Sequence, residues 1–446
     1  MKQLSLFPEW DASVQSVKPT IYSELQRIEA KFAPLISEEL RLGKLVSYVG
    51  NKSIPILRLY RYKEAFSWQL VKEFITRFEL KEEDYLFEPF CGMGTTLFTA
   101  MQHNVPAIGI DKLPIATFVA RTLPLFSSLE GQTLQKTFTA LRGRVSQAEL
   151  AEVALDVAIM KVAFAPDTFL SLRRWKATID TLSSPMRDIF LLLFLSILEP
   201  CSYTAKDGQF LRMKRDRLIP DPDEIMQQKV YEAEKDIQLI RCLWKENKQT
   251  QLPHVQLADA RDLSSVNFEK APTAIITSPP YANRYDYTRT YSLELCFNFV
   301  KNFEELKALR FGILRSHIES KVEDTDKPSH PVIEEVVNIL RNRGKALNNP
   351  RIPDMLTAYF VDMRKVIKEW ARVLAPGGKI AMVVDNVRFE GEMVPVDLVL
   401  SEMAEDVGFK VEQIIIARYK GNSSQQMGKY GRVPVRESIV IWQKEK

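Results

Sequence analysis

Four residues that could perform chemistry stand directly after the apolar segment Ala274–Ile276 and Thr277: Ser278, Pro279, Pro280 and Tyr281. Two successive prolines fix φ at about −65° and remove two N–H donors, so a strand that ends here must leave the sheet with its carbonyl groups exposed. The Ser278 hydroxyl and the Pro279 carbonyl could then accept the hydrogens of an amine on an aromatic ring, whose nitrogen is otherwise a poor nucleophile. Tyr281 adds a flat face on which such a ring could stack. The alternative is an ordinary strand-to-loop turn.

A glycine-rich turn upstream is the second candidate site. The apolar segment Tyr85–Phe87 is typical of a buried strand, and it leads into Glu88-Pro89-Phe90-Cys91-Gly92-Met93-Gly94-Thr95. Glycine at positions 92 and 94 lets the backbone approach a ligand where a Cβ atom would collide, and Glu88 could bind a charged or hydroxylated group. The third glycine of the dinucleotide-binding pattern is missing, which argues against a nicotinamide or flavin site.

Two further apolar segments end in acidic residues. Asp111 follows Ala107–Ile110, in the position from which a carboxylate holds the ribose hydroxyls of an adenosine. Asp259, followed by Ala260, ends a third expected strand that begins at Val255, and it could accept a hydrogen bond from an adenine amino group. Acidic residues at strand ends are also common as solvated turn residues, which is the alternative for both.

Taken in order, these elements resemble the S-adenosylmethionine-dependent DNA methyltransferases that modify N4 of cytosine or N6 of adenine. The resemblance runs from about residue 45 to the end of the chain. It implies a doubly wound, mostly parallel α/β sheet of seven strands whose last two are antiparallel, a large helical insertion, and S-adenosylmethionine as cofactor. It also implies that the cofactor is bound by an upstream segment, the glycine-rich turn and the later acids, namely Phe66, Glu88, Pro89, Phe90, Gly92, Gly94, Thr95, Asp111, Asp259 and Ala260.

The catalytic motif of this family is (Ser/Asp/Asn)-Pro-Pro-(Tyr/Phe/Trp), which Ser278, Pro279, Pro280 and Tyr281 match. Serine in the first position is typical of the cytosine-N4 members and aspartate of the adenine-N6 members. We therefore expect methylation of cytosine N4, with adenine N6 as the alternative, because a hydroxyl and a carboxylate can both accept from an amine. The target base would be flipped out of the helix before its amine attacks the methyl group.

Composition restricts the class of protein. The 446 residues, 46% of them hydrophobic, suffice for a large domain and a second lobe, and a net charge of +4 means that nucleic acid must be bound by local patches. Cys91, Cys201, Cys242 and Cys296 are scattered, so we expect no metal site, no disulfide and a reducing cytoplasm. No signal peptide is visible, and the longest apolar run, Ile189–Leu198, predicts a buried helix because it is too short to cross a membrane. We expect a cytoplasmic, nucleoid-associated protein of a bacterial or archaeal cell.

The spacing of the motifs predicts the organisation of the chain. Residues 1–40 should form a tail and a lead-in helix, and residues 41–115 and 251–446 the catalytic domain. Residues 116–250 should be an insertion, because a doubly wound domain needs only a helix and two loops at that point. Helical spacing of apolar residues predicts helices at 133–154, 185–200 and 223–247 within the insertion, and later ones near 291–303, 355–374 and 396–407.

Several segments are candidates for contact with double-stranded DNA. The basic stretch 206–217 of the insertion includes an aromatic residue, which suits phosphate contact and base stacking, so the insertion is the candidate target-recognition region. A solvated charged face is the alternative. The polar stretch 320–353 is expected to be a mobile loop that orders on DNA, and the amides of 420–426 could read base edges or cap a hairpin. The individual residues that we expect to bind DNA are Arg212, Lys214, Arg215, Arg284, Tyr285 and Arg289.

The N-terminus carries a separate motif. Gln3, Leu4, Leu6 and Phe7 resemble the peptide with which bacterial replication and repair proteins dock on the sliding clamp. The alternative is that these hydrophobic residues pack on the protein's own surface.

Other functions remain open from the sequence. A nuclease could use Pro220-Asp221 with Glu246-Asn247-Lys248, but the second group stands at the end of an expected helix, whereas nuclease acids lie on strands. An RNA base-amine methyltransferase would share the Pro-Pro-Tyr motif, and a catalytically silent DNA-binding subunit would share the fold. We expect a restriction-modification or host-defence context, with a cognate restriction endonuclease as a further partner.

Overall fold

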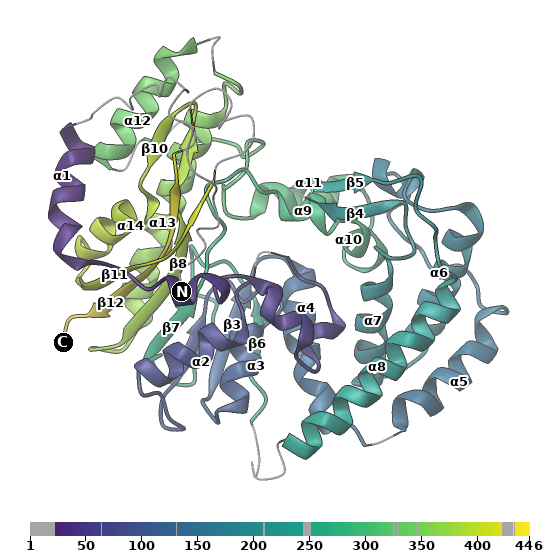
Figure 1. Cartoon of the computed structure of the whole chain (residues 1–446). Coiled ribbons are helices and arrows are strands. Elements are labelled where there is room, and N and C mark those ends of the chain that lie inside the picture. Colours follow the sequence, from purple (N-terminus) through teal and green to yellow (C-terminus); the bar gives the residue numbers. More distant parts are fainter. Residues whose placement is uncertain are drawn as a thin grey trace, which may run out of the picture.

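An eight-stranded sheet forms the middle layer of the lobe on the left of Figure 1. The computed structural model describes residues 23–63, 65–130, 132–207, 210–243, 251–323, 326–327, 330–344, 347–421, 431 and 433–446. The strand order is β1-β11-β12-β8-β7-β2-β3-β6. The strands span Ile36–Glu38 (β1), Leu86–Glu88 (β2), Ala107–Asp111 (β3), His254–Leu257 (β6), Ala274–Thr277 (β7), Lys379–Asp385 (β8), Phe409–Lys420 (β11) and Val435–Lys444 (β12).

Strand direction brings the predicted motifs to one edge of the sheet. β12 pairs antiparallel with both of its neighbours, β8 and β11, and the other pairs are parallel. The carboxyl ends of β2, β3, β6, β7 and β8 therefore meet at the same edge, where a doubly wound fold binds its ligands. The predicted α/β fold is confirmed. The predicted strand count was too low by one, because the short strand β1 pairs with β11 and its three residues form no recognisable pattern.

Helices cover both faces of the sheet. Phe87 and Ile275 pack against the helices of one face, and their neighbours Leu86 and Ala274 pack against the other, because successive strand residues point to opposite sides. The first face is covered by α1 (Ser23–Phe32), α12 (Pro331–Asn342), α13 (Ile352–Val373) and α14 (Val396–Glu405). The second face is covered by α2 (Trp68–Arg77) and α3 (Thr95–Gln102).

The stretch 320–353, predicted to be a mobile loop, instead contains α12. Its buried residues are Val332, Ile333, Val336, Val337 and Leu340, which recur at helical spacing and pack on α13. The polar residues between them lie on the outer side of the helix and concealed this pattern. A small hairpin, β9 (Val387–Phe389) with β10 (Glu392–Val394), follows β8 and was also not predicted.

A second lobe, on the right of Figure 1, lies beside the sheet and contains the insertion. The predicted helices are present as α5, α7 and α8, although α5 ends well before residue 154. The run that predicted a buried helix is fully packed in α7. The elements of the lobe, with α4 leading into it, are α4 (Pro114–Thr122), η5 (Leu123–Ser128), α5 (Thr133–Val145), η6 (Ala158–Lys161), α6 (Pro166–Asp180), α7 (Met186–Ile197), β4 (Thr204–Asp207), β5 (Phe210–Met213) and α8 (Pro222–Leu243).

The basic stretch 206–217 begins in the hairpin of β4 and β5. Leu211 of β5 is partly buried while its neighbour Arg212 is exposed, as alternation along a strand requires. The segment after the catalytic motif, expected to be one helix, is divided into α9 (Tyr287–Thr290), α10 (Ser292–Asn298) and α11 (Phe303–Gly312). α9 lies against β5, and residues of α10 belong to the same hydrophobic core as α5 to α8.

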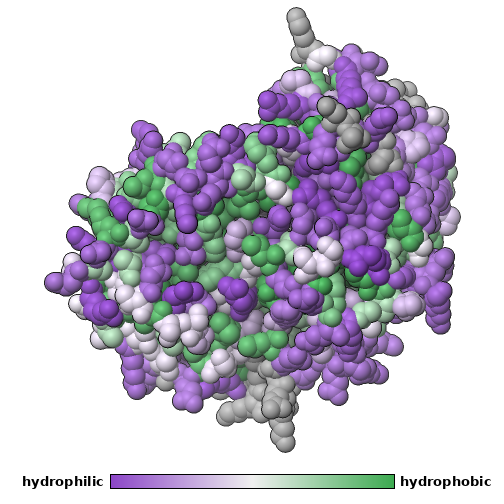
Figure 2. Space-filling view, turned by 180° about the vertical axis from the view of Figure 1, so that it is seen from behind, coloured by the Kyte–Doolittle hydropathy of each residue, from purple (hydrophilic) through white to green (hydrophobic). Residues whose placement is uncertain are grey.

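Hydrophilic side chains cover most of the back of the molecule, with small hydrophobic patches between them (Figure 2). Within the part of the chain that the structure describes, no helix has the length and apolar character needed to span a membrane. The N-terminal motif at Gln3, Leu4, Leu6 and Phe7 lies outside the described residues, as do Glu246, Asn247 and Lys248 and most of 420–426.

A buried ion pair holds the hairpin of β4 and β5 against α10. Lys206 on β4 and Glu294 on α10 form this pair, and their side chains are only 3% and 1% exposed. The Tyr60 hydroxyl donates to Glu294 Oε1 at 3.2 Å, and Lys206 Nζ lies 4.4 Å from the ring centroid of Tyr291. A charge buried this deeply is tolerated only with a partner, so the pair fixes how the hairpin sits on α10.

We predict that Glu294→Gln lowers the free energy of unfolding by about 3–5 kcal/mol, because Lys206 would remain as an unpaired buried charge. Urea unfolding followed by circular dichroism measures the change. Glu304→Gln is the matched control, since Glu304 is 75% exposed and its surface pair with Lys307 should contribute at most about 1 kcal/mol. Equal effects of the two substitutions would contradict the role of the buried pair.

Candidate active site

The two sequence motifs lie side by side because the strands that carry them are neighbours. β2 and β7 pair in parallel, with Phe87 opposite Ile275. Glu88 ends β2 and Thr277 ends β7, and the Thr277 hydroxyl donates to Glu88 Oε1. The glycine-rich turn and Ser278 therefore leave the sheet at adjacent points.

The buried carboxyl group of Glu88 accepts hydrogen bonds from three different segments. It accepts from Thr96 Oγ1 at 2.7 Å and from the Phe90 N–H at 3.2 Å, in addition to Thr277. The residue is 2% exposed, and burial raises the pKa of the Glu88 carboxyl to about 8. Glu88 was predicted to bind the cofactor. Its oxygens are already engaged by these three donors, so it also holds the turn, α3 and β7 together.

The two glycines of the turn have left-handed backbone conformations. Gly92 has φ +50° and Gly94 has φ +84°, which side chains rarely adopt. A Cβ atom on Gly94 would lie 2.9 Å from Cα of Ala120, and one on Gly92 would lie 3.2 Å from the ring of Tyr62. The turn thus requires glycine for both its conformation and its packing.

Asp111, at the end of the neighbouring strand β3, accepts a hydrogen bond from the glycine-rich turn. Its Oδ2 accepts from the Gly92 N–H at 3.0 Å and its Oδ1 accepts from the Leu113 N–H at 2.9 Å. Burial raises the pKa of the Asp111 carboxyl to about 6. Each oxygen keeps a lone pair that could accept from a ligand hydroxyl.

The first pocket at this edge of the sheet brings most of the predicted cofactor residues together. It is lined by Pro89, Phe90, Gly92, Asp111, Asp259, Ala260, Ser278 and Pro280, with Tyr62 and Arg261 among the others. Arg261 was not predicted. Its Nη2 donates to Asp259 Oδ2 at 2.7 Å and its Nη1 to Asp362 Oδ2 at 2.9 Å, so Asp259 is tied to α13. In the sequence, the only indication of this role is that Arg261 stands two residues after the predicted Asp259.

A second, smaller pocket lies behind the first. The predicted residues Phe66, Glu88, Gly92 and Thr95 line it together with Tyr62 and Ser278. Asn51, which was not predicted, positions its wall: Nδ2 donates to the Phe66 carbonyl at 2.9 Å and to Thr95 Oγ1 at 3.3 Å. An isolated asparagine in a segment of short 3-10 turns gives no sequence signal.

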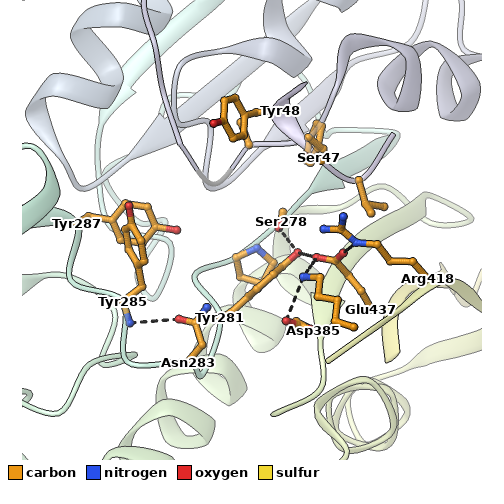
Figure 3. Close-up of a pocket in the computed structure, with 15 residues that line it drawn as sticks. Ser47, Tyr48, Ser278, Tyr281, Asn283, Tyr285, Tyr287, Asp385, Arg418 and Glu437 are labelled. Carbon is orange, nitrogen blue, oxygen red and sulfur yellow. Dashed lines mark hydrogen bonds and ion pairs between the residues drawn. The ribbon is translucent and has the colours of Figure 1, made fainter. Parts of the chain in front are cut away.

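A third pocket, with a cavity of about 230 Å³, opens on the other side of Ser278 (Figure 3). Ser278, Pro279 and Tyr281 form one side of it, and aromatic side chains, among them Tyr48, Tyr285 and Tyr287, line it elsewhere. Ser278 is shared by all three pockets. This serine therefore stands where the two predicted cofactor pockets meet a chamber lined by aromatic rings.

Four charged residues form one wall of the third pocket: Asp385, Arg418, Lys420 and Glu437. Of these, only Lys420 belonged to a candidate segment, 420–426, which was expected to read base edges or to cap a hairpin. Lys420 Nζ donates to Glu437 Oε1 at 2.7 Å and to Asp385 Oδ2 at 3.2 Å. Burial raises the pKa of the Asp385 carboxyl to about 7. These residues stand far apart in the sequence, on β8, β11 and β12, and only the pairing of the strands brings them together.

The residues expected to bind DNA fall into two groups. Arg212, Lys214 and Arg215 are exposed at the hairpin of the second lobe. Arg284 instead has its guanidinium carbon 5.9 Å from the ring centroid of Phe389, and burial lowers its pKa. Arg289 pairs with Asp286 and Glu319, and Tyr285 is 4% exposed and lines the third pocket.

Thiols and carboxylates give no indication of a metal site. Cys91, Cys201 and Cys296 are buried free thiols. Across the described ranges, no group of three or more His, Cys, Asp and Glu residues is arranged to hold a metal ion.

We predict that Gly94→Ala weakens cofactor binding by about tenfold or more, because the strained backbone and the contact with Ala120 displace the turn. Calorimetric titration with S-adenosylmethionine measures the affinity. Gly377→Ala is the matched control, since Gly377 has φ +76° but no atom within 4 Å of the added Cβ. Wild-type affinity in Gly94→Ala would contradict this account of the turn.

The raised pKa of Glu88 gives a second prediction, for the protein without ligands. The folded state binds the Glu88 proton more tightly than the unfolded chain, so this contribution to stability is full below about pH 4.5 and is lost as the pH rises through about 8. Glu88→Gln, which carries no titrating proton, should flatten part of the decline between these pH values. Asp111 and Asp385 act in the same direction, whereas burial lowers the pKa values of His103, His317 and His330, which act in the opposite direction. Urea unfolding at a series of pH values measures the free energy of unfolding of the wild type and of Glu88→Gln. The same dependence on pH in both proteins would contradict the prediction.

Known proteins resemble this chain over most of its length, although no family model matches it. Type II methyltransferase M.BsoBI of Geobacillus stearothermophilus is 33% identical over 474 residues, covering 94% of this chain and 92% of that protein. Type II methyltransferase M.AvaI of Nostoc sp. is 33% identical over 459 residues, covering 94% of each. Among solved structures, TrmN from Thermus thermophilus is 9% identical with a TM-score of 0.31, covering 88% of this chain and 53% of that one.

The similarity to M.BsoBI and M.AvaI extends over both lobes, because it covers nearly the whole chain. The family predicted from the glycine-rich turn and the Ser-Pro-Pro-Tyr motif is confirmed. S-adenosylmethionine is accordingly the cofactor. The chain belongs to the Type II methyltransferases.

Proposed function

We propose that this protein transfers the methyl group of S-adenosylmethionine to the exocyclic amine of a base flipped out of double-stranded DNA, at N4 of cytosine. The observation that carries the proposal is the position of Ser278, which is shared by the two predicted cofactor pockets and the aromatic chamber. The names of the relatives M.BsoBI and M.AvaI, Type II methyltransferases, support DNA as the substrate and a restriction-modification context with a cognate endonuclease.

The residues of the first two pockets fit this cofactor. The Gly92 turn leaves the backbone open beside Asp111, and Phe66 and Thr95 line the smaller space behind it. In our proposal Asp111 accepts from the ribose hydroxyls, and the smaller pocket holds the methionine end. S-adenosylmethionine supplies an electrophilic methyl group when bound.

The chain's own residues then prepare the amine. Ser278 Oγ and the Pro279 carbonyl accept its hydrogens, which localises the nitrogen lone pair and directs it toward the cofactor pockets. Tyr281 stacks on the base, and Tyr285 and Tyr287 close the chamber on another side. The aromatic lining compensates the loss of stacking when a base leaves the helix.

The charged wall supports cytosine over adenine. On the Watson–Crick edge that carries its amine, cytosine presents two acceptors, the ring N3 and the O2 carbonyl. Adenine presents one acceptor on that edge, N1, and has its N7 on the other side of the amine. Lys420 and Arg418 bring N–H donors to the chamber, and Lys420 has one donor more than its two carboxylate partners use. Together with serine in the first position of the motif, this favours cytosine N4.

Contact with the DNA backbone is proposed for Arg212, Lys214 and Arg215, which are exposed on the hairpin of the second lobe. The hairpin reaches the chamber through α9, which follows the catalytic motif directly. The insertion at 116–250 is accordingly our candidate for target recognition, in a protein that works in the cytoplasm on the nucleoid.

We predict that DNA from cells expressing the protein contains N4-methylcytosine, and that Ser278→Ala removes it while calorimetric titration still shows cofactor binding. Mass spectrometry of hydrolysed nucleosides makes the measurement. Ser264→Ala, a change at an exposed serine outside the three pockets, is the matched control and should leave the modification in place.

The products separate the alternatives. N6-methyladenine would keep the mechanism and overturn the choice of base. A methylated base in RNA alone would point to an RNA enzyme. The absence of any product with the wild type, despite cofactor binding, would favour a catalytically silent DNA-binding subunit.

A further inference from the structure

A chain of hydrogen bonds leads from Ser278 to a carboxylate on β12, two strands away from β7 in the sheet (Figure 3). Ser278 Oγ lies 3.4 Å from the Tyr281 hydroxyl oxygen, and this hydroxyl lies 3.0 Å from Glu437 Oε1. Ser278 and Tyr281 belong to the catalytic motif after β7. Glu437 belongs to β12, the one antiparallel strand of the sheet, and has no part in any sequence motif.

Two cations contact the Glu437 carboxylate, one at each oxygen. The Glu437 side chain is 2% exposed, and Arg418 contacts Oε2 while Lys420 Nζ lies 2.7 Å from Oε1. An ionised carboxylate can only accept hydrogen bonds. The Tyr281 hydroxyl must therefore be the donor in the bond between them.

Tyr281 retains the proton that this bond requires. Burial, and then the nearby carboxylate of Glu437, raise the pKa of the Tyr281 hydroxyl well above its usual value. Because its hydrogen points to Glu437, its oxygen presents lone pairs to Ser278. The Ser278 hydroxyl then donates to Tyr281, and its own lone pairs are left for the chamber.

This direction matters for the reaction. A serine hydroxyl can either donate or accept, and a donor facing the amine would bind the lone pair that must attack the methyl group. An aspartate in the same position would have no such ambiguity, since it accepts only. This chain has serine, which can donate or accept, in the first position of the motif. Glu437 on β12, acting through the Tyr281 hydroxyl, determines in which direction the Ser278 hydroxyl donates.

We propose that Glu437 is a positioning residue which, through the Tyr281 hydroxyl, fixes Ser278 as a hydrogen-bond acceptor toward the amine of the target base. This inference rests on the proposed function. Glu437 itself does not touch the base in this scheme. Arg418 and Lys420 serve it by keeping its charge compensated within the sheet.

Three variants test the inference: Tyr281→Phe, which keeps the ring and removes the hydroxyl, Glu437→Gln, and the double variant. Single-turnover methylation of genomic DNA with tritiated S-adenosylmethionine gives the rate constant, and calorimetry gives the cofactor affinity. Each single variant should lose roughly tenfold in rate with unchanged cofactor affinity, because one oriented hydrogen bond is lost. The double variant should be no slower than Tyr281→Phe, since both changes break the same chain.

The matched control is Glu412→Gln on β11, whose carboxylate is 37% exposed and pairs with Lys410. It should retain the wild-type rate. Circular dichroism establishes that each variant is folded, and if Glu437→Gln does not fold, the rate of Tyr281→Phe against wild type still decides whether the hydroxyl chain is needed.

The outcomes are distinct from those of the proposed function. A wild type that methylates no DNA would refute the function itself. A wild type that methylates, with Tyr281→Phe or a folded Glu437→Gln within twofold of its rate, would overturn the inference. Effects that multiply in the double variant would show that Glu437 acts only by supporting the strands, and would overturn it as well.

Discussion

The hydrogen bond between Thr277 and Glu88 joins the two strand ends on which the active site depends. Through it, the carboxyl of β2 holds the start of the catalytic motif on β7, while the Phe90 N–H and the Thr96 hydroxyl fix the glycine-rich turn to the same group. A group that binds three elements at once must be buried, and burial is what raises its pKa. Cofactor site and catalytic motif are therefore aligned by the protein before any ligand arrives.

The part of the site that could be predicted consists of short segments that are continuous in the sequence. Glu88 to Thr95 and Ser278 to Tyr281 are each continuous in sequence, and their glycines and prolines restrict the backbone strongly enough to be recognised without a structure. Asp111 was recognisable because it ends an apolar strand. In each of these cases the residue and the reason for its position stand within a few residues of each other.

The unpredicted part depends on contacts between distant segments. Glu437 and Lys420 are brought to the chamber by the pairing of β12 with β11, whose register shifts between Val411 and Gln413 and again between Ile416 and Arg418. Asn51 and Arg261 act through the groups that they tie together, and such a role leaves no pattern in composition or spacing. α12 was missed for a different reason, since its polar outer face hid an apolar face that is regular at helical spacing.

The core of the second lobe is not confined to the insertion. Side chains from Ile56 to Tyr62, between β1 and β2, and from Tyr291 to Phe297, after the catalytic motif, belong to the same hydrophobic cluster as α5 to α8. Tyr62 stacks on Tyr291 with ring centroids 4.8 Å apart, and it also lines both of the proposed cofactor pockets. The lobe is thus not a module that can be exchanged at two junctions: a graft that carried residues 116–250 into a relative would arrive without part of its own core. Under the proposed role of this lobe in target recognition, altering the specificity by recombination would require transfer of the three segments together.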